Sequence, residues 1–238
     1  GHLKAVIDGD RNLTHKTLPK FQKAMALANK SQRDFFGALV RYNQAATVTE
    51  KCEVFEEMNR LKRANVHLSS LTDSQYRFLS HWLYPTIYVM TDLVEFRNDA
   101  SWIRENILHE VKESDIEDAV ASMLELKLLS QDADGKLRQV PNAIQVPDEV
   151  RAVAVLKYHR SMLSLVDSIL NTSVTKKSER ELNGLTMPVE TEKLEEIKQR
   201  VREFRDEMNR YTSSLDKPNA VYQLNLHLIP LTKMKDER

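Results

Sequence analysis

The sequence has very few of the residues on which disulfides and phosphate-binding loops depend. Its 238 residues include one cysteine, Cys52, so no disulfide can form within the chain, which is typical of proteins in a reducing cytoplasm. Only five glycines occur, and there is no Walker loop, no dinucleotide-binding fingerprint and no Gly-x-Ser-x-Gly nucleophile elbow. These absences predict a cytoplasmic protein that is not an enzyme and uses no cofactor.

Membrane-spanning and metal-binding patterns are lacking as well. The longest apolar stretch, residues 83–94, is interrupted by Pro85 and Asp92 and is too short to span a bilayer. No basic and apolar leader opens the sequence, so no signal peptide is expected. The seven histidines include no pair at metal-ligand spacing on a helix, and His109-Glu110-x-x-Glu113 lacks the second histidine of a zinc-protease motif. We therefore expect no membrane contact and no metal site.

The net charge is zero, with 35 basic and 35 acidic residues, but the two signs are separated along the chain. Residues 1–66 carry a net charge of +5, residues 67–150 carry −8, and residues 151–238 carry +3. Such an asymmetry indicates that different parts of the chain meet different partners.

Residues 1–66 are predicted to be entirely helical. Gly9 can end a first helix formed by residues 3–8, and Pro19 is tolerated in the first turn of the next helix. Ser31 is expected to cap the helix that follows, and Thr47-x-x-Glu50 is a capping box for a fourth. Cys52 lies on the apolar face of that fourth helix, which favours a buried thiol over a nucleophile.

Residues 67–147 have the pattern of a winged helix. A long apolar helix is expected first, with a kink at Pro85, and two shorter helices follow it. Asp134-Gly135 then predicts a two-residue turn between two short strands. Three helices followed by a hairpin are typical of winged-helix units. The capping residues expected for the three helices are Thr72, Asp99 and Ser114.

Residues 148–238 are predicted to form an α+β effector or dimerisation domain. Apolar residues spaced three and four apart indicate two helices, the second running from Leu194 to Tyr211 behind a Thr191 cap. Alternation at 185–189 and 222–228 predicts two strands, which form a parallel pair if they are neighbours. The apolar stripe of the second helix fits packing within the chain or a dimeric coiled coil.

The fold class expected for the whole chain is thus mainly α, of the α+β type, in three parts. Residues 1–66 form a partial helix-turn-helix unit, residues 67–147 a winged-helix-like unit, and residues 148–238 helices with a small sheet. The third part contains the only polar candidates for a ligand or anion site. The simpler interpretation is that its helical histidine lies at the edge of a packing face and binds no ligand. These candidates are Tyr158, His159, Arg160 and His227.

The winged pattern suggests DNA binding, but the charge of the middle unit opposes it. Its third helix, residues 114–127, carries four acidic side chains against one lysine and would repel phosphates. We expect this unit to be a scaffold, a dimer contact or a surface for a protein partner, with only Lys136 and Arg138 of the hairpin available to DNA. The basic surplus before Asn43 favours DNA binding there instead, with a solvated basic surface as the alternative.

Several stretches carry a family resemblance; they read IDGDRNLT, KFQKAMAL, FFGALVRYNQA, SHWLYPTIYVMTDL and VYQLNLHLIPLT. Together they resemble a family of predicted bacterial transcriptional regulators with an N-terminal lambda-repressor-type helix-turn-helix and a largely uncharacterised C-terminal domain. The resemblance implies a cytoplasmic regulator that binds DNA through its N-terminal unit. A homodimer would place two recognition helices in successive major grooves.

The resemblance also implies roles for the first residues. Residues 1–8 match the recognition helix, and the residues that follow match the connector that grips phosphate. In the family two further helices precede this point, so we expect the apolar side chains of residues 3–7 to be covered by a neighbouring chain or poorly ordered. The candidate DNA contacts, including two lysines of the adjoining basic surface, are His2, Lys4, Arg11, Asn12, Lys16 and Lys20.

Two alternatives remain at the level of the sequence. The acidic middle unit could bind a protein partner, or the C-terminal domain could sense a small molecule, and in neither case would the chain itself bind DNA.

Overall fold

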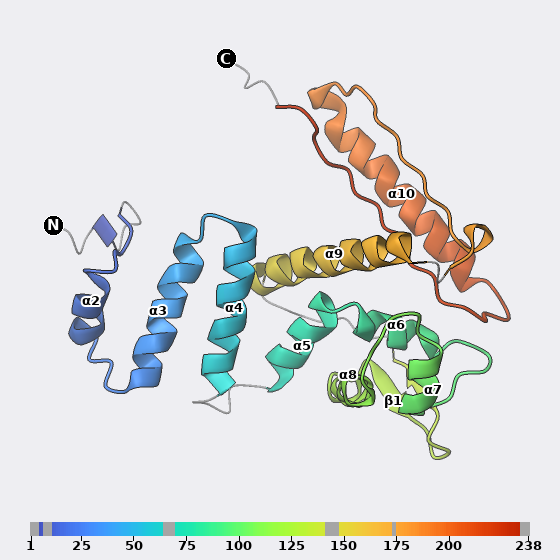
Figure 1. The fold of residues 1–238 in the computed structure, drawn as a ribbon, viewed down its shortest axis with the longest axis horizontal. Coiled ribbons are helices and arrows are strands. Elements are labelled where there is room, and N and C mark those ends of the chain that lie inside the picture. The colour runs from blue at the N-terminus through green and yellow to red at the C-terminus, as the bar shows by residue number, and fades with distance from the viewer. Residues whose placement is uncertain (1–4, 7–10, 64–69, 141–147, 173–174, 234–238) are drawn as a thin grey trace.

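A computed structural model describes residues 5–6, 11–63, 70–140, 148–172 and 175–233 (Figure 1). Within this part helices predominate, and the sheet has two antiparallel strands, which confirms the mainly α class with a small β component. No helix in these ranges is long and apolar enough to cross a membrane. Of the helix expected at 3–8, only Ala5 and Val6 are described, and both are helical. Its stop at Gly9 and the side chains of His2 and Lys4 lie outside the described residues.

The N-terminal part contains α2 (Leu18–Ala24), α3 (Lys30–Gln44) and α4 (Val48–Arg63). Pro19 lies in the first turn of α2, as predicted, where its missing N–H leaves no hydrogen bond unmade. The predicted cap at Ser31 is wrong. Asn29 caps α3 instead, because its side chain accepts from the Gln32 N–H at 2.8 Å. Ser31 consequently lies inside the first turn.

The predicted capping box of α4 forms in part. Thr47 Oγ1 accepts from the Glu50 N–H at 3.2 Å, as expected. The Glu50 carboxylate reaches back to the N–H of Ala46, also at 3.2 Å, and so binds one residue further out than a standard capping box.

The middle part contains α5 (Ser70–Ser80), α6 (Leu83–Met90), α7 (Ala100–Glu105) and α8 (Glu113–Glu125). The single kinked helix expected around Pro85 is two helices. Pro85 cannot continue the hydrogen bonding of α5, so α6 begins at Leu83 and places the proline in its own first turn. Thr72 is inside α5 rather than at its cap. Asp99 caps α7 as predicted, accepting from the Trp102 N–H at 2.7 Å.

Helix α8 begins one residue before Ser114, so the predicted Ser114 cap is also wrong. Its N-cap is Lys112, whose side chain makes no capping hydrogen bond. Two carboxylates in the first turn, Glu113 and Asp115, compensate, because negative charge is favourable at the positive end of a helix.

The hairpin joins β1 (Leu129–Gln131) to β2 (Leu137–Gln139), with Leu129 opposite Gln139. Its loop has three residues rather than the predicted two, because the Asp132 N–H donates to the Lys136 carbonyl at 3.0 Å. Gly135 takes the position with positive φ, at 80°. After two-residue turns, a three-residue loop that ends in such a glycine is among the most common connections in β-hairpins.

A small cluster of Ala38, Val54 and Met58 holds α3 against α4, and two larger cores hold the other helices together. One joins α6, α7, α8 and the hairpin, and its most deeply buried side chains include Leu83, Ile87, Ile103, Ile116 and Met123. The other joins α4, α5 and the long α9 (Asp148–Asn171), and it contains Cys52, Phe55, Tyr76, Val153 and Ala154. The second core crosses the boundary expected near residue 66 and ties the N-terminal helices to the rest.

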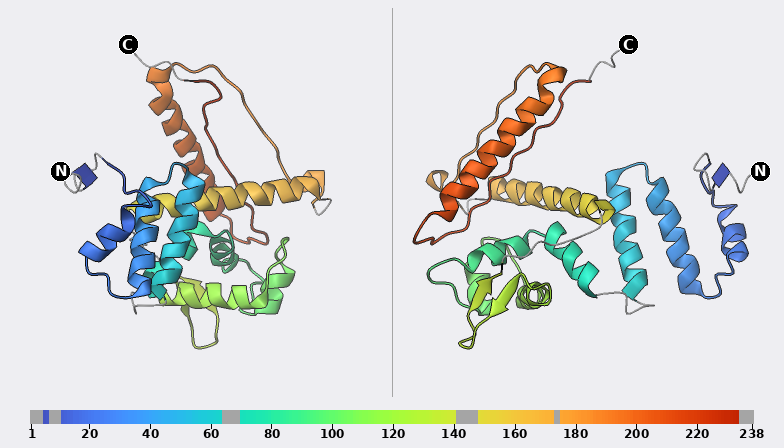
Figure 2. Two further views of the ribbon diagram at one scale, coloured as in Figure 1. Left: turned by 60° about the vertical axis from the view of Figure 1, so that its left-hand side comes forward. Right: turned by 180° about the vertical axis from the view of Figure 1, so that it is seen from behind.

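Beyond α9 the chain forms an arm, which we define as residues 181–233 (Figures 1 and 2). It contains a 3-10 turn (η2, Thr191–Lys193) and α10 (Leu194–Ser213). Lys193 is the N-cap of α10, so the predicted Thr191 cap is wrong. The predicted C-terminal sheet is also not formed, since 181–190 and 219–230 are extended but unpaired. In Figure 1 they lie on either side of α10.

Candidate functional site

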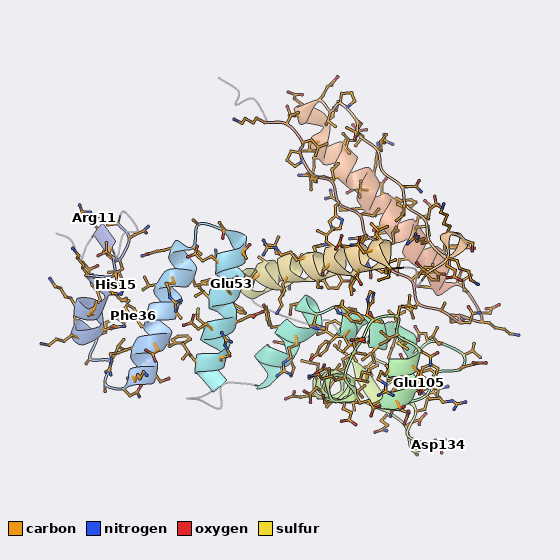
Figure 3. All side chains as sticks on the ribbon, viewed as in Figure 1. Arg11, His15, Phe36, Glu53, Glu105 and Asp134 are labelled. Carbon is orange, nitrogen blue, oxygen red and sulfur yellow. The ribbon has the colours of Figure 1, made fainter. Side chains whose placement is uncertain are left out.

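A stripe of lysines lies on α2 and the turn before it. Lys16, Lys20 and Lys23 are four and three residues apart, so they share one side, and all three are exposed. The other side of α2 packs on α3, where a Cβ on Gly37 would lie 3.8 Å from Leu18 Cδ2. None of the three lysines forms an ion pair with a described residue. Figure 3 shows this end of the molecule, next to the labelled Arg11 and His15.

The predicted connector residues lie beside this stripe. Arg11 and Asn12 are both exposed, and the Arg11 N–H donates to the Ala5 carbonyl at 3.0 Å. This contact folds the connector back toward the N-terminus. Four of the six predicted DNA contacts (Arg11, Asn12, Lys16 and Lys20) are therefore on one accessible end of the molecule.

Other basic residues of the N-terminal part have structural roles. The Arg33 guanidinium donates to the carbonyls of Leu27 and Ala28 at 3.1 and 2.9 Å, which closes the end of α2 onto α3. Arg41 pairs with Glu57 at 2.5 Å and joins α3 to α4. Near this end of the described chain, the exposed lysines without an ion pair to a described residue are Lys16 before α2, Lys20 and Lys23 on it, and Lys30 at the start of α3.

Helix α8, which the sequence predicted as the third helix of the middle unit and which is the fourth, presents acidic side chains to solvent. Asp115, Glu117 and Asp118 are all exposed. In the hairpin, Arg138 is engaged by Asp132 at 3.3 Å, whereas Lys136 is exposed. Backbone hydrogen bonding from Lys136 is the main cause that lowers the pKa of Asp132. The middle unit therefore offers DNA little positive charge.

The polar candidates of the C-terminal part are only partly brought together. Tyr158 OH donates to Gln223 Oε1 at 3.2 Å, and His159 Nδ1 lies 3.2 Å from His227 Nε2, so α9 is joined to the second extended segment. Arg160 turns the other way and donates to Thr49 Oγ1 of α4 at 2.6 Å. Gln223 was missed by sequence reasoning, although its alternation with His227 places both on one face of the segment.

The two histidines bind each other and leave little room for a ligand. Burial, and after it the charge of His227, lower the pKa of His159, so the neutral imidazole of His159 is favoured. Burial raises the pKa of Tyr158. Among the described residues no third histidine, cysteine or carboxylate completes a metal site. The arrangement is suited to fastening the arm to α9.

A small pocket of about 210 Å³ lies between α4 and α9, lined by Thr49, Cys52, Glu53, Glu56, Lys157 and Arg160. Its charges are already engaged, because Lys157 pairs with Glu56 and Arg160 with Thr49. Burial raises the pKa of the Cys52 thiol, whose Sγ is 4.0 Å from the Val153 carbonyl oxygen. A protonated, buried thiol is unreactive, so no nucleophile is assigned here.

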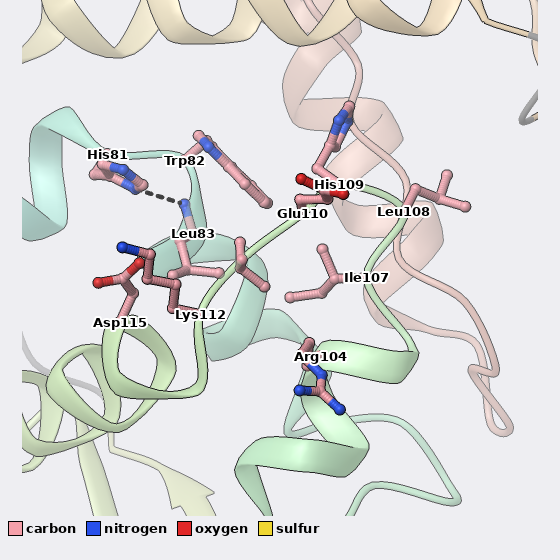
Figure 4. Close-up of a pocket in the computed structure, with 11 residues that line it drawn as sticks. His81, Trp82, Leu83, Arg104, Ile107, Leu108, His109, Glu110, Lys112 and Asp115 are labelled. Atoms are coloured by element: carbon pink, nitrogen blue, oxygen red, sulfur yellow. Dashed lines mark hydrogen bonds between the residues drawn. The ribbon is translucent and has the colours of Figure 1, made fainter.

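A larger hollow of about 620 Å³ lies between the start of α6 and the segment joining α7 to α8 (Figure 4). His81 Nδ1 accepts from the Leu83 N–H at 3.3 Å, and the Trp82 ring meets the His109 ring edge to face at 5.5 Å. Burial is the main cause that lowers the pKa of both histidines. The neutral imidazoles and the indole ring form an aromatic wall of the hollow. Among the residues that line it, no base lies beside a nucleophile.

Comparison with known proteins places most of the chain in one family. The family model of DUF4423, described as a domain of unknown function, matches residues 62–231. No curated protein and no solved structure matches the chain. The matched region starts at the end of α4 and runs almost through the arm, whereas the lysine stripe of α2 precedes it. The match spans well over half of the sequence, so the chain belongs to the DUF4423 family.

Proposed function

We propose that this chain is part of a cytoplasmic bacterial transcriptional regulator that binds DNA as a homodimer through its N-terminal helices. The DUF4423 region would hold the two DNA-binding units at a fixed separation. The observation that carries the proposal is the stripe of unpaired lysines on α2, which lies outside the family region on an exposed face. Lys20 and Lys23 lie on α2 and Lys16 on the turn before it, and such a row of exposed cations suits a phosphate backbone better than a small ligand.

The rest of the charge pattern is consistent with this choice of surface. The acidic face of α8 cannot approach a phosphate backbone without repulsion, so DNA binding by the winged-helix-like unit is disfavoured. A homodimer would present two lysine stripes, one from each chain. Repressor-type dimers bind the two half-sites of an operator in this way. The family resemblance of the N-terminal stretches points to the same class of protein.

The test is the salt dependence of DNA binding by the whole protein. Fluorescence anisotropy on a labelled duplex gives the slope of log affinity against log salt. Replacing Lys16, Lys20 and Lys23 together by alanine should reduce that slope by about 2.7, since each lost phosphate contact removes about 0.9. A matched triple replacement of other exposed lysines should leave the slope unchanged. The control lysines are Lys127, Lys177 and Lys217.

Two results contradict the proposal. One is the lack of any salt-sensitive affinity for duplex DNA in the unaltered protein. The other is an equal loss in the matched control, because then only total charge matters and the α2 surface has no special role.

The acidic face of α8 supports a second candidate function, that of a protein-interaction module. Asp115 and Asp118 are exposed in a unit with a surplus of acidic residues, and such a face suits a basic protein surface. The whole protein should then retain a partner from nuclease-treated lysate, and replacing both aspartates by lysine should release it. If the partner is still retained after this charge reversal, the acidic face of α8 is not its binding surface.

A further inference from the structure

The arm of residues 181–233 leaves an unusual amount of apolar surface uncovered. No residue of α10 is buried. Its apolar stripe is half-covered at Leu194, Ile197 and Val201, yet Phe204 and Tyr211 are exposed. The extended segments on either side contribute more, with Leu185 81% and Tyr222 74% exposed. A soluble chain that exposes apolar residues contiguously in this way needs a surface to cover them.

The backbone of the arm is equally incomplete. Residues 181–190 and 219–230 are extended, and neither segment pairs with any described strand. Extended segments with alternating apolar residues and unpaired N–H and C=O groups readily accept another strand. Both segments are therefore open for pairing over most of their length, except at Pro188, which has no N–H, and at the Glu190 carbonyl, which accepts from the Lys193 N–H at 2.9 Å.

The second segment shows which of its faces is available. Gln223 and His227 are bonded to α9, so the odd-numbered face is already occupied. Side chains alternate along an extended chain, which places Tyr222, Leu224, Leu226 and Leu228 on the opposite face, where Leu226 is half-buried and the other three are exposed. Most of this apolar face is thus free.

The total surface agrees with a missing partner. The chain exposes 17,831 Å². A compact monomer of 27.6 kDa is expected to expose about 11,000 Å², so the excess is about 6,800 Å². Obligate homodimers bury roughly 1,000–2,500 Å² on each chain. The excess is ample for an interface of that kind.

The charges of α10 favour an identical partner. The helix carries equal numbers of acidic and basic side chains, and several pair within it, as Arg200 does with Glu196 at 2.9 Å and Arg202 with Glu195 at 2.6 Å. A two-fold interface brings the same patch of both copies together, so a patch with net charge would repel itself. This neutral surface does not, and it gives no electrostatic preference to a charged partner of another kind.

We propose that the arm pairs with the arm of a second copy, so that residues 219–230 of one chain complete a sheet with residues 181–190 of the other. The two α10 helices would cover one face of this shared sheet. The inference specifies the surface of the homodimer in the proposed function and rests on that proposal for the choice of a second copy.

The test is the oligomeric state of the whole protein, measured by light scattering at micromolar concentration without DNA. We expect a mass of about 55 kDa, twice the 27.6 kDa of one chain. Replacing Leu224 and Leu228 together by lysine should give a 27.6 kDa monomer. The same change at Val89 and Leu108, which are exposed apolar residues outside the arm, should leave the dimer intact.

Infrared spectra provide a second readout that does not depend on the mutants. The amide I band should show more paired strand in the dimer than in the protein diluted until it dissociates. A monomer at all accessible concentrations overturns the inference, as does a dimer that resists the arm replacements or shows no gain in paired strand. A stable complex with a different protein, formed by an otherwise monomeric chain, also overturns it.

The outcomes separate this inference from the proposed function. A dimer that is broken by the arm replacements but has no affinity for DNA supports the arm interface and contradicts DNA binding. Salt-sensitive DNA binding by a protein that remains monomeric supports the α2 surface and contradicts the arm interface.

Discussion

Replacing Phe55 by alanine tests whether the N-terminal helices fold together with the family region. Phe55 lies on α4 and is 8% exposed. Its ring centroid is 5.0 Å from that of Tyr76 on α5 and 5.8 Å from that of Tyr42 on α3, and it shares a core with Val153 of α9. One side chain therefore contacts the helices on both sides of the start of the family match.

The expected loss of stability is large. Truncating a buried phenylalanine costs about 3–5 kcal/mol, because transfer free energy is lost and a cavity remains. The two tilted ring contacts place this site in the upper part of that range, since aromatic pairs add stabilisation beyond buried area. For a chain of this length about 4 kcal/mol lowers Tm by roughly 8–16 °C. That is a substantial share of the roughly 5–15 kcal/mol that stabilises a typical domain.

Two probes of urea unfolding make the test specific. Both tryptophans, Trp82 and Trp102, pack against the core of α6, α7 and α8, so their fluorescence reports that core. Far-UV circular dichroism reports every helix. If the second core couples the parts, both transitions should move to lower urea together. Leu108 is 60% exposed, and its replacement by alanine should change stability by less than about 0.5 kcal/mol.

The reasoning is refuted by either of two results. A loss below about 1 kcal/mol would mean that Phe55 is not buried as described. A shift in circular dichroism with unchanged tryptophan fluorescence would mean that α2–α4 unfold independently of the family region.

Three further predictions concern single contacts. Because the pKa of His159 is lowered in the folded chain, the unfolded chain takes up this proton first. The stability linked to the neutral His159 imidazole is therefore complete above about pH 6.5 and is lost as the pH falls. His159→Gln should therefore flatten the pH dependence of the urea midpoint between about pH 5 and 7.5. Asp99→Ala should cost about 1 kcal/mol in urea unfolding, and Asp99→Asn much less. Gly135→Ala should cost about 1–2 kcal/mol because φ is positive, whereas Gly184→Ala, which meets nothing within 4 Å, should change Tm by under about 1 °C.

The features that the sequence predicts well are those decided within a few residues. Asp99 precedes a short helix with nothing better upstream, so its side chain caps α7. Pro19 has one tolerable place in a helix, the first turn, and it occupies that place. The Asp134-Gly135 pair located the hairpin, although the loop has one more residue because Asp132 pairs with Lys136 before the turn closes.

Several predicted caps failed for a common reason. Ser31, Thr72 and Ser114 each fit a capping pattern, but each helix begins further upstream. A helix extends toward its N-terminus as long as the backbone permits and packing rewards it, and a local motif cannot report that. For α3 the competing Asn29 is two residues earlier, and asparagine is at least as good a cap as serine.

The candidate polar site shows what sequence proximity cannot decide. Tyr158, His159 and Arg160 are consecutive, but successive residues of a helix point in directions about 100° apart. His159 therefore meets His227, while Arg160 meets Thr49 on α4. The partners lie 68 and 111 residues away in the chain, so only the packing of α9 between α4 and the arm determines them.

The C-terminal strands are the most informative difference between sequence and structure. Alternation at 185–189 and 222–228 predicted two strands, but neither segment forms a strand. Both run as extended chain beside α10 (Figure 1). Alternation determines which side chains share a face, and here it correctly separates Gln223 and His227 from Leu224. It carries no information on which chain supplies the neighbouring strand. Within a single chain each segment has its conformation, but its strand-pairing hydrogen bonds are not made and its apolar face is not covered. A second copy of the same arm can supply both the pairing strand and the cover for the apolar face.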